Sequence, residues 1–229
     1  MKMAGVCKLC GREYGGAVCM RCAREPHWPQ AREKYINSLF PPRIKNDLVK
    51  YESPTRTAIA HELVNKMLEE EGQGVYIYNE QTRSGKTLLA AEVVLAWLHE
   101  QHLQARRPEV SFTILSKVLQ AQSVYRAKLF SSELKQWEPA PLDLCAEAPL
   151  LVLDDFGIEN IEGKQIYEQI YGLVNERYEY LKPTIFTSNM SLEQLLSQFN
   201  DVRIPSRIGR MCSTIVRYHY LEGCEEDAN

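Results

Sequence analysis

The chain has 229 residues, of which 45% are hydrophobic and 25% are charged, and this composition excludes a fibrous, collagen-like or wholly disordered protein. Its net charge of −3 conceals an asymmetry, because residues 1–50 carry 10 Lys and Arg against 4 Asp and Glu, whereas residues 51–229 carry 17 against 26. The basic head favours contact with an anionic polymer at that end, although a solvated lysine-rich surface has the same composition.

The first 25 residues are rich in Cys and Gly and contain two CxxC pairs, Cys7 with Cys10 and Cys19 with Cys22. Four thiolates at this spacing predict a tetrahedral Zn²⁺ site of the structural kind, because such a site leaves no open position for catalysis. A segment this short has no core of its own, so the metal would supply its folding energy. We therefore expect a zinc-binding knuckle over residues 1–25 that docks either a protein or single-stranded DNA.

The remaining cysteines are scattered, and the odd total of 7 argues against a secreted disulfide framework. No stretch of the sequence approaches the ~18 consecutive apolar residues of a membrane span, and the N-terminal residues lack the apolar core of a signal peptide. We expect a soluble, cytoplasmic protein that makes no contact with membranes.

Prolines at positions 26, 29, 41 and 42 surround one short amphipathic stretch, which predicts a linker with a single short helix over residues 26–44. The main domain then spans residues 45–229. Within it, apolar periodicity predicts helices over 53–72, 86–103, 116–130, 162–181, 191–199 and 203–210, and strands over 74–78, 110–114, 149–153, 183–187 and 213–218. This alternation predicts an α/β fold whose parallel sheet is covered by helices on both faces.

The sequence NEQTRSGKT lies between an expected strand and an expected helix, which is the position of a phosphate-binding loop. In such a loop backbone N–H groups bind phosphate oxygens, Lys86 reaches the β and γ phosphates of a nucleotide, and the Thr87 hydroxyl ligates Mg²⁺. Glu80 and Arg83 occupy positions where glycine is common, and we expect Glu80 to weaken nucleotide binding unless it points outward, with Arg83 to offset it. A surface turn before an amphipathic helix is the alternative interpretation. The expected nucleotide-binding residues are Gln81, Thr82, Arg83, Ser84, Gly85, Lys86, Thr87 and Leu88.

Two adjacent acids, Asp154 and Asp155, follow the apolar run that is expected to form the strand at 149–153. A strand end that bears acids places carboxylates where a cation bound to Thr87 would lie. We expect Asp154 to hold Mg²⁺ through water and Asp155 to polarise the attacking water. Taken alone, two acids after a strand are usually a helix cap or a turn.

Polar side chains later in the chain complete the predicted site. Asn189 follows the strand at 183–187, where an amide can hydrogen-bond the water or the γ-phosphate, although Asn also occurs simply at turns. The segment DVRIPSRIGR contains Arg203, Arg207 and Arg210, and an arginine inserted across a subunit boundary would stabilise charge on the transferred phosphoryl group. A solvated or DNA-facing basic helix is the alternative for each of them.

The segments LLVLDDFG, NERYEYLKPTIFTSN and RIPSRIGRMC resemble the AAA+ ATPases of the bacterial and phage helicase-loader family (DnaC/DnaI-like), to which IstB-type transposition helpers are also similar. The resemblance runs from about Pro41 to Tyr220. It implies Lys86 and Thr87 as Walker A, Asp154 and Asp155 as Walker B, Asn189 as sensor 1 and Arg207 as the arginine finger. The loop departs from the family by lacking its earlier glycines. We expect no helical lid after residue 218, which agrees with the family.

The resemblance implies an ATP-dependent loader that deposits a hexameric replicative DNA helicase on single-stranded DNA, using ATP, Mg²⁺ and Zn²⁺. It also implies self-association through the arginine finger and a zinc head that contacts the helicase. Two alternatives stay open: an IstB-like transposition ATPase that acts on duplex DNA, and an adaptor that binds nucleotide without hydrolysing it.

Overall fold

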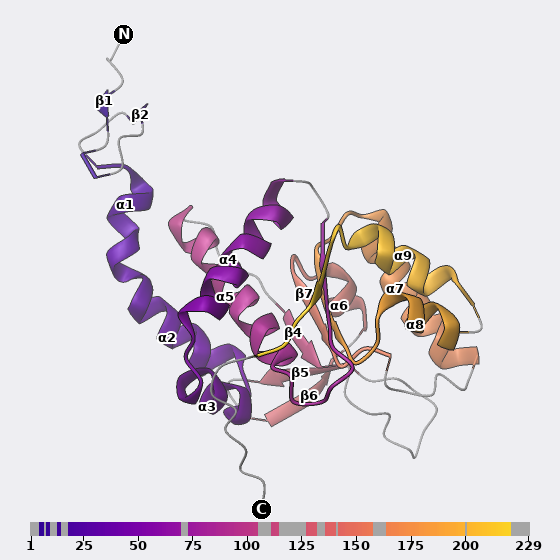
Figure 1. The fold of residues 1–229 in the computed structure, drawn as a ribbon. Coiled ribbons are helices and arrows are strands. Elements are labelled where there is room, and N and C mark those ends of the chain that lie inside the picture. Colours follow the sequence, from indigo (N-terminus) through magenta and orange to yellow (C-terminus); the bar gives the residue numbers. More distant parts are fainter. Residues whose placement is uncertain are drawn as a thin grey trace, which may run out of the picture.

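The structure is a computed structural model that describes residues 5–6, 8–9, 13–14, 18–69, 73–104, 111–114, 127–131, 136–140, 142–157, 164–199 and 201–220 (Figure 1). The helices are α1 (Met20–Arg24), the 3-10 helix η1 (Glu25–His27), α2 (Trp28–Leu39), α3 (Pro42–Lys50), α4 (Pro54–Glu69), α5 (Lys86–Leu103), α6 (Leu142–Glu147), α7 (Lys164–Glu179), α8 (Leu192–Gln198) and α9 (Arg203–Met211). The strands are β1 (Gly5–Val6), β2 (Glu13–Tyr14), β3 (Val75–Tyr78), β4 (Ser111–Ile114), β5 (Ala127–Ser131), β6 (Gln136–Ala140), β7 (Leu151–Asp154), β8 (Thr184–Ser188) and β9 (Thr214–Arg217). Among these helices none is both long and apolar enough to cross a membrane.

The central sheet has seven strands in the order β6-β5-β4-β7-β8-β3-β9. The five strands from β4 to β9 in this order are parallel, which confirms the expected parallel sheet, and β3 lies between β8 and β9. Since parallel strands end at the same edge, the segments that follow β3, β7 and β8 meet there.

The far side of β4 differs from the expectation. Residues 127–130 were expected to close a helix over 116–130, but they belong to β5, which pairs antiparallel with β4 and with β6. Residues 115–126 lie outside the described part of the chain. The open edge of β4 offers backbone donors and acceptors, and pairing with that edge overrides the local helical pattern. Neither β6 nor α6 was expected from the sequence.

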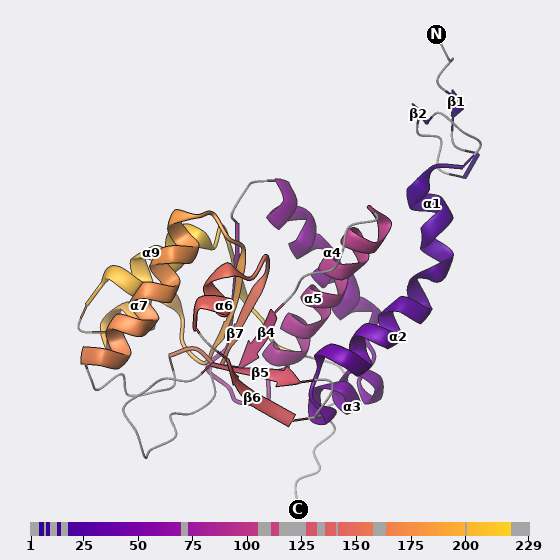
Figure 2. The same cartoon turned by 180° about the vertical axis from the view of Figure 1, so that it is seen from behind.

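Helices cover both faces of the sheet, as Figures 1 and 2 show from opposite sides. Val75 and Ile77 of β3 point into a core shared with α3, α4 and α5, while Tyr76 points into a second core shared with α6, α7, α8 and α9. This alternation of neighbouring residues is the two-residue period of a strand that is buried on both faces.

The segment before residue 45 is more structured than the expected linker with a single helix. It forms η1, α2 and the beginning of α3, and the boundary expected near residue 45 falls inside α3. Pro41 and Pro42 begin α3 as its N-cap and first residue, where a missing N–H costs nothing. Phe40 and Leu48, 1% and 2% exposed, join the core that α5 shares.

Helix α5 carries ion pairs to the helices that precede it. Arg32 of α2 donates to the buried carboxylate of Glu92 at 3.1 Å, and Arg56 of α4 lies 3.7 Å from the same carboxylate. Near the end of α5, both oxygens of Glu100 accept hydrogen bonds from Arg21 of α1 at 2.9 Å. The helix is therefore anchored by charged contacts along its length as well as by its apolar residues.

Candidate functional site

The loop over residues 79–85 begins where β3 ends and leads directly into α5. Tyr218 and Tyr220, which follow β9, flank this loop. The N–H of Tyr218 donates to the Tyr78 carbonyl at 2.9 Å, and the N–H of Tyr220 donates to the Ser84 carbonyl at 3.1 Å. Asn79 fixes the start of the loop, because its Nδ2 donates to the Tyr218 carbonyl at 2.9 Å. The loop is thus held on one side by the C-terminal strand.

The backbone of the loop is left-handed at two positions, Arg83 with φ 59° and Gly85 with φ 85°. A Cβ added at Gly85 would lie 3.2 Å from the Tyr220 Cβ, so both its φ and its surroundings favour glycine. Arg83 occupies the position where glycine is common in such loops, and its positive φ gives the physical reason for that preference.

The ammonium group of Lys86 is buried inside the loop. Its Nζ donates to the carbonyls of Asn79 at 3.1 Å and Gln81 at 3.0 Å and to the Ser84 hydroxyl at 3.0 Å. Burial lowers the pKa of Lys86, while the nearby carboxylates of Asp155 and Asp154 act to raise it. The loop therefore surrounds a positive charge that faces the two acids.

Thr87 and Asp154 are in direct contact. The Thr87 hydroxyl donates to the Asp154 carboxylate at 2.9 Å and 3.1 Å, and the Thr187 hydroxyl donates to the same carboxylate at 2.5 Å. Asp154 is only 3% exposed. Burial, helped by the neighbouring Asp155 carboxylate, raises the pKa of Asp154 to about 6, although the two hydroxyl hydrogen bonds act in the opposite direction.

Asp155 begins the turn after β7 with a left-handed φ of 57°, and its side chain is exposed. Its backbone N–H donates to the Thr187 hydroxyl oxygen at 2.8 Å, so Thr187 connects both acids to β8. Asn189 follows Ser188, the residue of β8 that is paired with Tyr78 of β3. Asn189 therefore lies at the same edge of the sheet as the loop and the acids.

Glu80 contacts the last strand of the sheet. Its carboxylate accepts hydrogen bonds from the Arg217 guanidinium at 2.9 Å and 3.2 Å. The pKa of Glu80 is lowered by its own backbone N–H and by Arg217. We expected Arg83 to offset this carboxylate, and the structure adds Arg217 of the neighbouring strand as its hydrogen-bond partner.

Arg207 lies on α9 and packs on α7. Its Nε donates to the Asn175 side chain at 2.6 Å, and its guanidinium lies over the rings of Tyr171 at 4.8 Å and Tyr178 at 5.8 Å. Arg203 pairs instead with Asp201. Within one chain the structure therefore brings together four of the predicted residues, Lys86, Thr87, Asp154 and Asp155. Arg207 is instead packed against α7.

The zinc ligands are only partly covered by the structure. Cys7 and Cys10 lie outside the described residues. Cys19 is the N-cap of α1 and Cys22 lies within the same helix, so the two positions are one turn apart on one side of it. The four-thiolate site stays a prediction.

Sequence reasoning missed two residues of this site, Thr187 and Asn79. Both were visible as polar residues at the end of an apolar strand. What the sequence lacks is the register: β8 lies beside β7 and pairs Phe186 with Leu153, which brings the next residue of β8 beside Asp154.

Comparisons with known proteins concern the fold. No protein-family model matches the chain, and no curated protein matches it. Among solved structures it is similar to the DnaC helicase loader, with 22% identity, 70% of this chain and 87% of that chain covered, and a TM-score of 0.48. It is also similar to DnaI (23% identity, 70% and 78% covered, TM-score 0.45) and to AMPPCP-bound DnaA from Aquifex aeolicus (20% identity, 71% and 46% covered, TM-score 0.46). These similarities do not themselves assign an activity to the chain.

Proposed function

We propose that this protein is an AAA+ ATPase. The observation that carries the proposal is the contact between Thr87, at the start of α5, and Asp154, at the end of β7. A loop whose N–H groups and lysine receive phosphates, next to a hydroxyl and two acids, is the arrangement that nucleotide hydrolysis requires. It comes from segments far apart in sequence, so a surface turn or a simple helix cap does not account for it.

The oxygen donors of this site fit Mg²⁺. The Thr87 hydroxyl and the Asp154 carboxylate are hard oxygen ligands in mutual contact, and the raised pKa of the buried Asp154 reflects a carboxylate whose surroundings do not balance its charge. Mg²⁺ bound there would supply charge neutralisation for the phosphates. In this proposal Thr87 and Asp154 hold the ion, Lys86 binds the β and γ phosphates, and Gln81 to Leu88 cradle them. Asp155 orients the attacking water, and Asn189 hydrogen-bonds the water or the γ-phosphate.

The biological role that we propose is that of a cytoplasmic helicase loader. It rests on the resemblance carried by the segments LLVLDDFG, PTIFTSN and RIPSRIGR. The zinc head would contact a hexameric replicative helicase, and the ATPase body would bind single-stranded DNA while copies of the chain associate. ATP hydrolysis would time the release of the helicase.

A direct test is the turnover of ATP by the full chain with Mg²⁺ and single-stranded DNA. We expect Lys86→Ala to lose nucleotide binding, and Asp155→Asn to keep binding while it loses turnover, because Asp155 acts on water and Lys86 acts on phosphate. Unchanged turnover in both variants would show that turnover does not depend on this site, and no turnover by the wild type at any protein concentration would remove the ATPase assignment.

The arginine finger requires a second copy of the chain. If Arg207 acts in trans, specific activity rises with protein concentration, and Arg207→Ala abolishes the rise while nucleotide binding is kept. Arg210→Ala is the matched control, since Arg210 is an exposed arginine on the same helix. An Arg207 variant with a normal concentration dependence would contradict this role.

The partner is tested by retention of a purified replicative helicase on the immobilised full chain. Retention supports the loader. If the helicase is not retained, while a transposase is retained and the chain prefers duplex DNA, the assignment moves to the IstB-like ATPase.

The second candidate is an adaptor that binds nucleotide without turnover, and it is favoured by Glu80 and Arg83, which occupy loop positions where glycine is common. Tight ATP binding without hydrolysis at any protein concentration would establish this candidate.

A further inference from the structure

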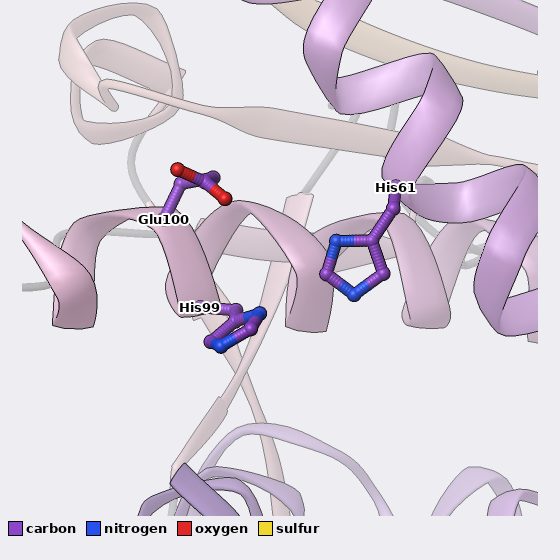
Figure 3. A group of neighbouring side chains, drawn as sticks. All are labelled: His61, His99 and Glu100. Atoms are coloured by element: carbon purple, nitrogen blue, oxygen red, sulfur yellow. The ribbon is translucent and has the colours of Figure 1, made fainter. Parts of the chain in front are cut away.

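A cluster of side chains outside the nucleotide site joins α4 to the far end of α5. His61 of α4 and His99 and Glu100 of α5 each offer one ligand atom, and these atoms all lie within 4.8 Å of one another (Figure 3). His99 follows Lys86 by 13 residues in one helix, or about 20 Å along its axis, so this cluster is separate from the phosphate loop.

His99 has a buried imidazole whose Nδ1 finds no polar partner in the part of the chain that the structure describes. The residue is 8% exposed, and among the described residues its Nε2 contacts only the Glu25 carboxylate, at 3.2 Å and without hydrogen-bond geometry. The Trp28 ring stacks on it with a centroid distance of 4.5 Å, which fixes the plane of the imidazole. Buried polar atoms are normally paired, and an unpaired one points to a missing partner such as an ion.

The carboxylate of Glu100 is oriented by Arg21, which donates to both of its oxygens at 2.9 Å. Each carboxylate oxygen accepts more than one bond, so this contact leaves lone pairs for a cation. Such an outer hydrogen bond is the usual means of orienting a metal ligand. Glu25 adds a second carboxylate, whose Oε1 lies 3.2 Å from the His99 Nε2. This oxygen is within reach of an ion bound at Nε2, or of the Nε2 N–H when the ion is bound at Nδ1.

The electrostatics of the cluster favour the ligand form of the histidine. Burial lowers the pKa of His99, and His61 and Arg21 act in the same direction, while Glu25 and Glu100 oppose them. A neutral imidazole has the lone pair that a metal binds. The alternative, a protonated His99 paired with Glu25, requires a buried charge that its surroundings disfavour.

We propose that His61, His99 and Glu100 form a binding site for a divalent transition metal, with Zn²⁺ as the expected ion. Two imidazoles and one carboxylate are ligands that Zn²⁺ accepts, and moderate rotation of the side chains brings atoms now up to 4.8 Å apart to bonding distance of one ion. The ion would connect α4 to α5 beside η1, where the segment before residue 45 meets the main domain.

The test counts zinc ions on the full chain after dialysis against zinc, by native mass spectrometry. We expect His61→Gln to hold one zinc ion fewer per chain than the wild type. His219→Gln, which alters an exposed histidine outside the cluster, is the matched control and should hold the same number as the wild type. Equal zinc content in the wild type and His61→Gln would overturn the proposal.

A second measurement separates this site from the cysteine knuckle and from misfolding. A chain in which Cys7, Cys10, Cys19 and Cys22 are all serine should still bind one zinc ion, which His61→Gln then removes. Zinc at about 100 times its dissociation constant should raise the melting temperature of this serine variant by roughly 5–10 °C, and this rise should vanish with His61→Gln. A serine variant that binds no zinc and shows no rise would also overturn the proposal.

Discussion

The buried carboxylate of Asp154 makes the nucleotide-free protein less stable at alkaline pH. Its pKa is raised from 3.8 to about 6 because burial and Asp155 disfavour the charged form. A raised folded-state pKa means that the contribution is favourable below the unfolded pKa and is lost as pH rises through about 6. This rise in the pKa lowers the free energy of unfolding by about 3 kcal/mol at pH 8 and by about half of that at pH 5.

The perturbation that exposes this cost is Asp154→Asn. The amide oxygen still accepts hydrogen bonds from Thr87 and Thr187, but no charge is buried. We expect the variant without nucleotide to be more stable than the wild type by about 3 kcal/mol at pH 8, with a smaller gain at pH 5. Conversely, Mg²⁺ and ATP should stabilise the wild type far more than the variant, since the variant lacks the charge that binds the ion.

The assay is urea denaturation of both proteins at pH 5 and pH 8, with and without Mg²⁺ and ATP. Matching slopes of free energy against urea in the two proteins would validate the comparison. If Asp154→Asn shifts stability equally at both pH values, the carboxylate does not carry the pH dependence and the reasoning is refuted.

Three further variants test the framework of the site. Thr187→Val should lower stability by about 2 kcal/mol and slow ATP turnover, because the N–H of Asp155 and the carboxylate of Asp154 each lose a partner. Urea denaturation and a turnover assay measure the two effects, and wild-type values in both would contradict this prediction. Gly85→Ala should weaken ATP binding at least tenfold, measured by calorimetry, since its φ of 85° and the Tyr220 Cβ at 3.2 Å both oppose a side chain; unchanged affinity would count against the loop geometry. Arg177→Met should cost about 3 kcal/mol or more in urea denaturation, because this buried guanidinium donates to four backbone carbonyls at 2.7–3.1 Å, and a loss below about 1 kcal/mol would argue against it.

The sequence was sufficient for the elements that position the site. The apolar runs that end in polar residues predicted β3, β7 and β8, because a strand buried on both faces has a continuous apolar pattern. The helix expected over 53–72 forms as α4, and the Ser53 hydroxyl at its start accepts the N–H of Arg56 at 3.2 Å. These features depend on local chemistry, which a sequence shows directly.

The features that the sequence did not predict depend on contacts between distant segments. The pairing of β5 with the edge of β4 overrides the helical pattern that was expected at 127–130. The partner of Glu80 is Arg217, 137 positions later, and no local pattern indicates it. The role of Thr187 likewise requires the register between β7 and β8. Arg207 belongs to α9 and packs against α7, and the role proposed for it requires a second copy of the chain, which a single sequence does not describe.

Helix α5 begins with Lys86 and Thr87 and ends beside the arginines of the head. Its 18 residues make a rod about 27 Å long, and an α-helix of this length bends little. A tilt of about 5° at its first turn therefore displaces its last turn by roughly 2 Å, enough to break the paired hydrogen bonds between Arg21 and Glu100. Because Lys86 and Glu100 lie on one helix, a tilt that moves the residues at its first turn also moves the contacts of its last turn with α1.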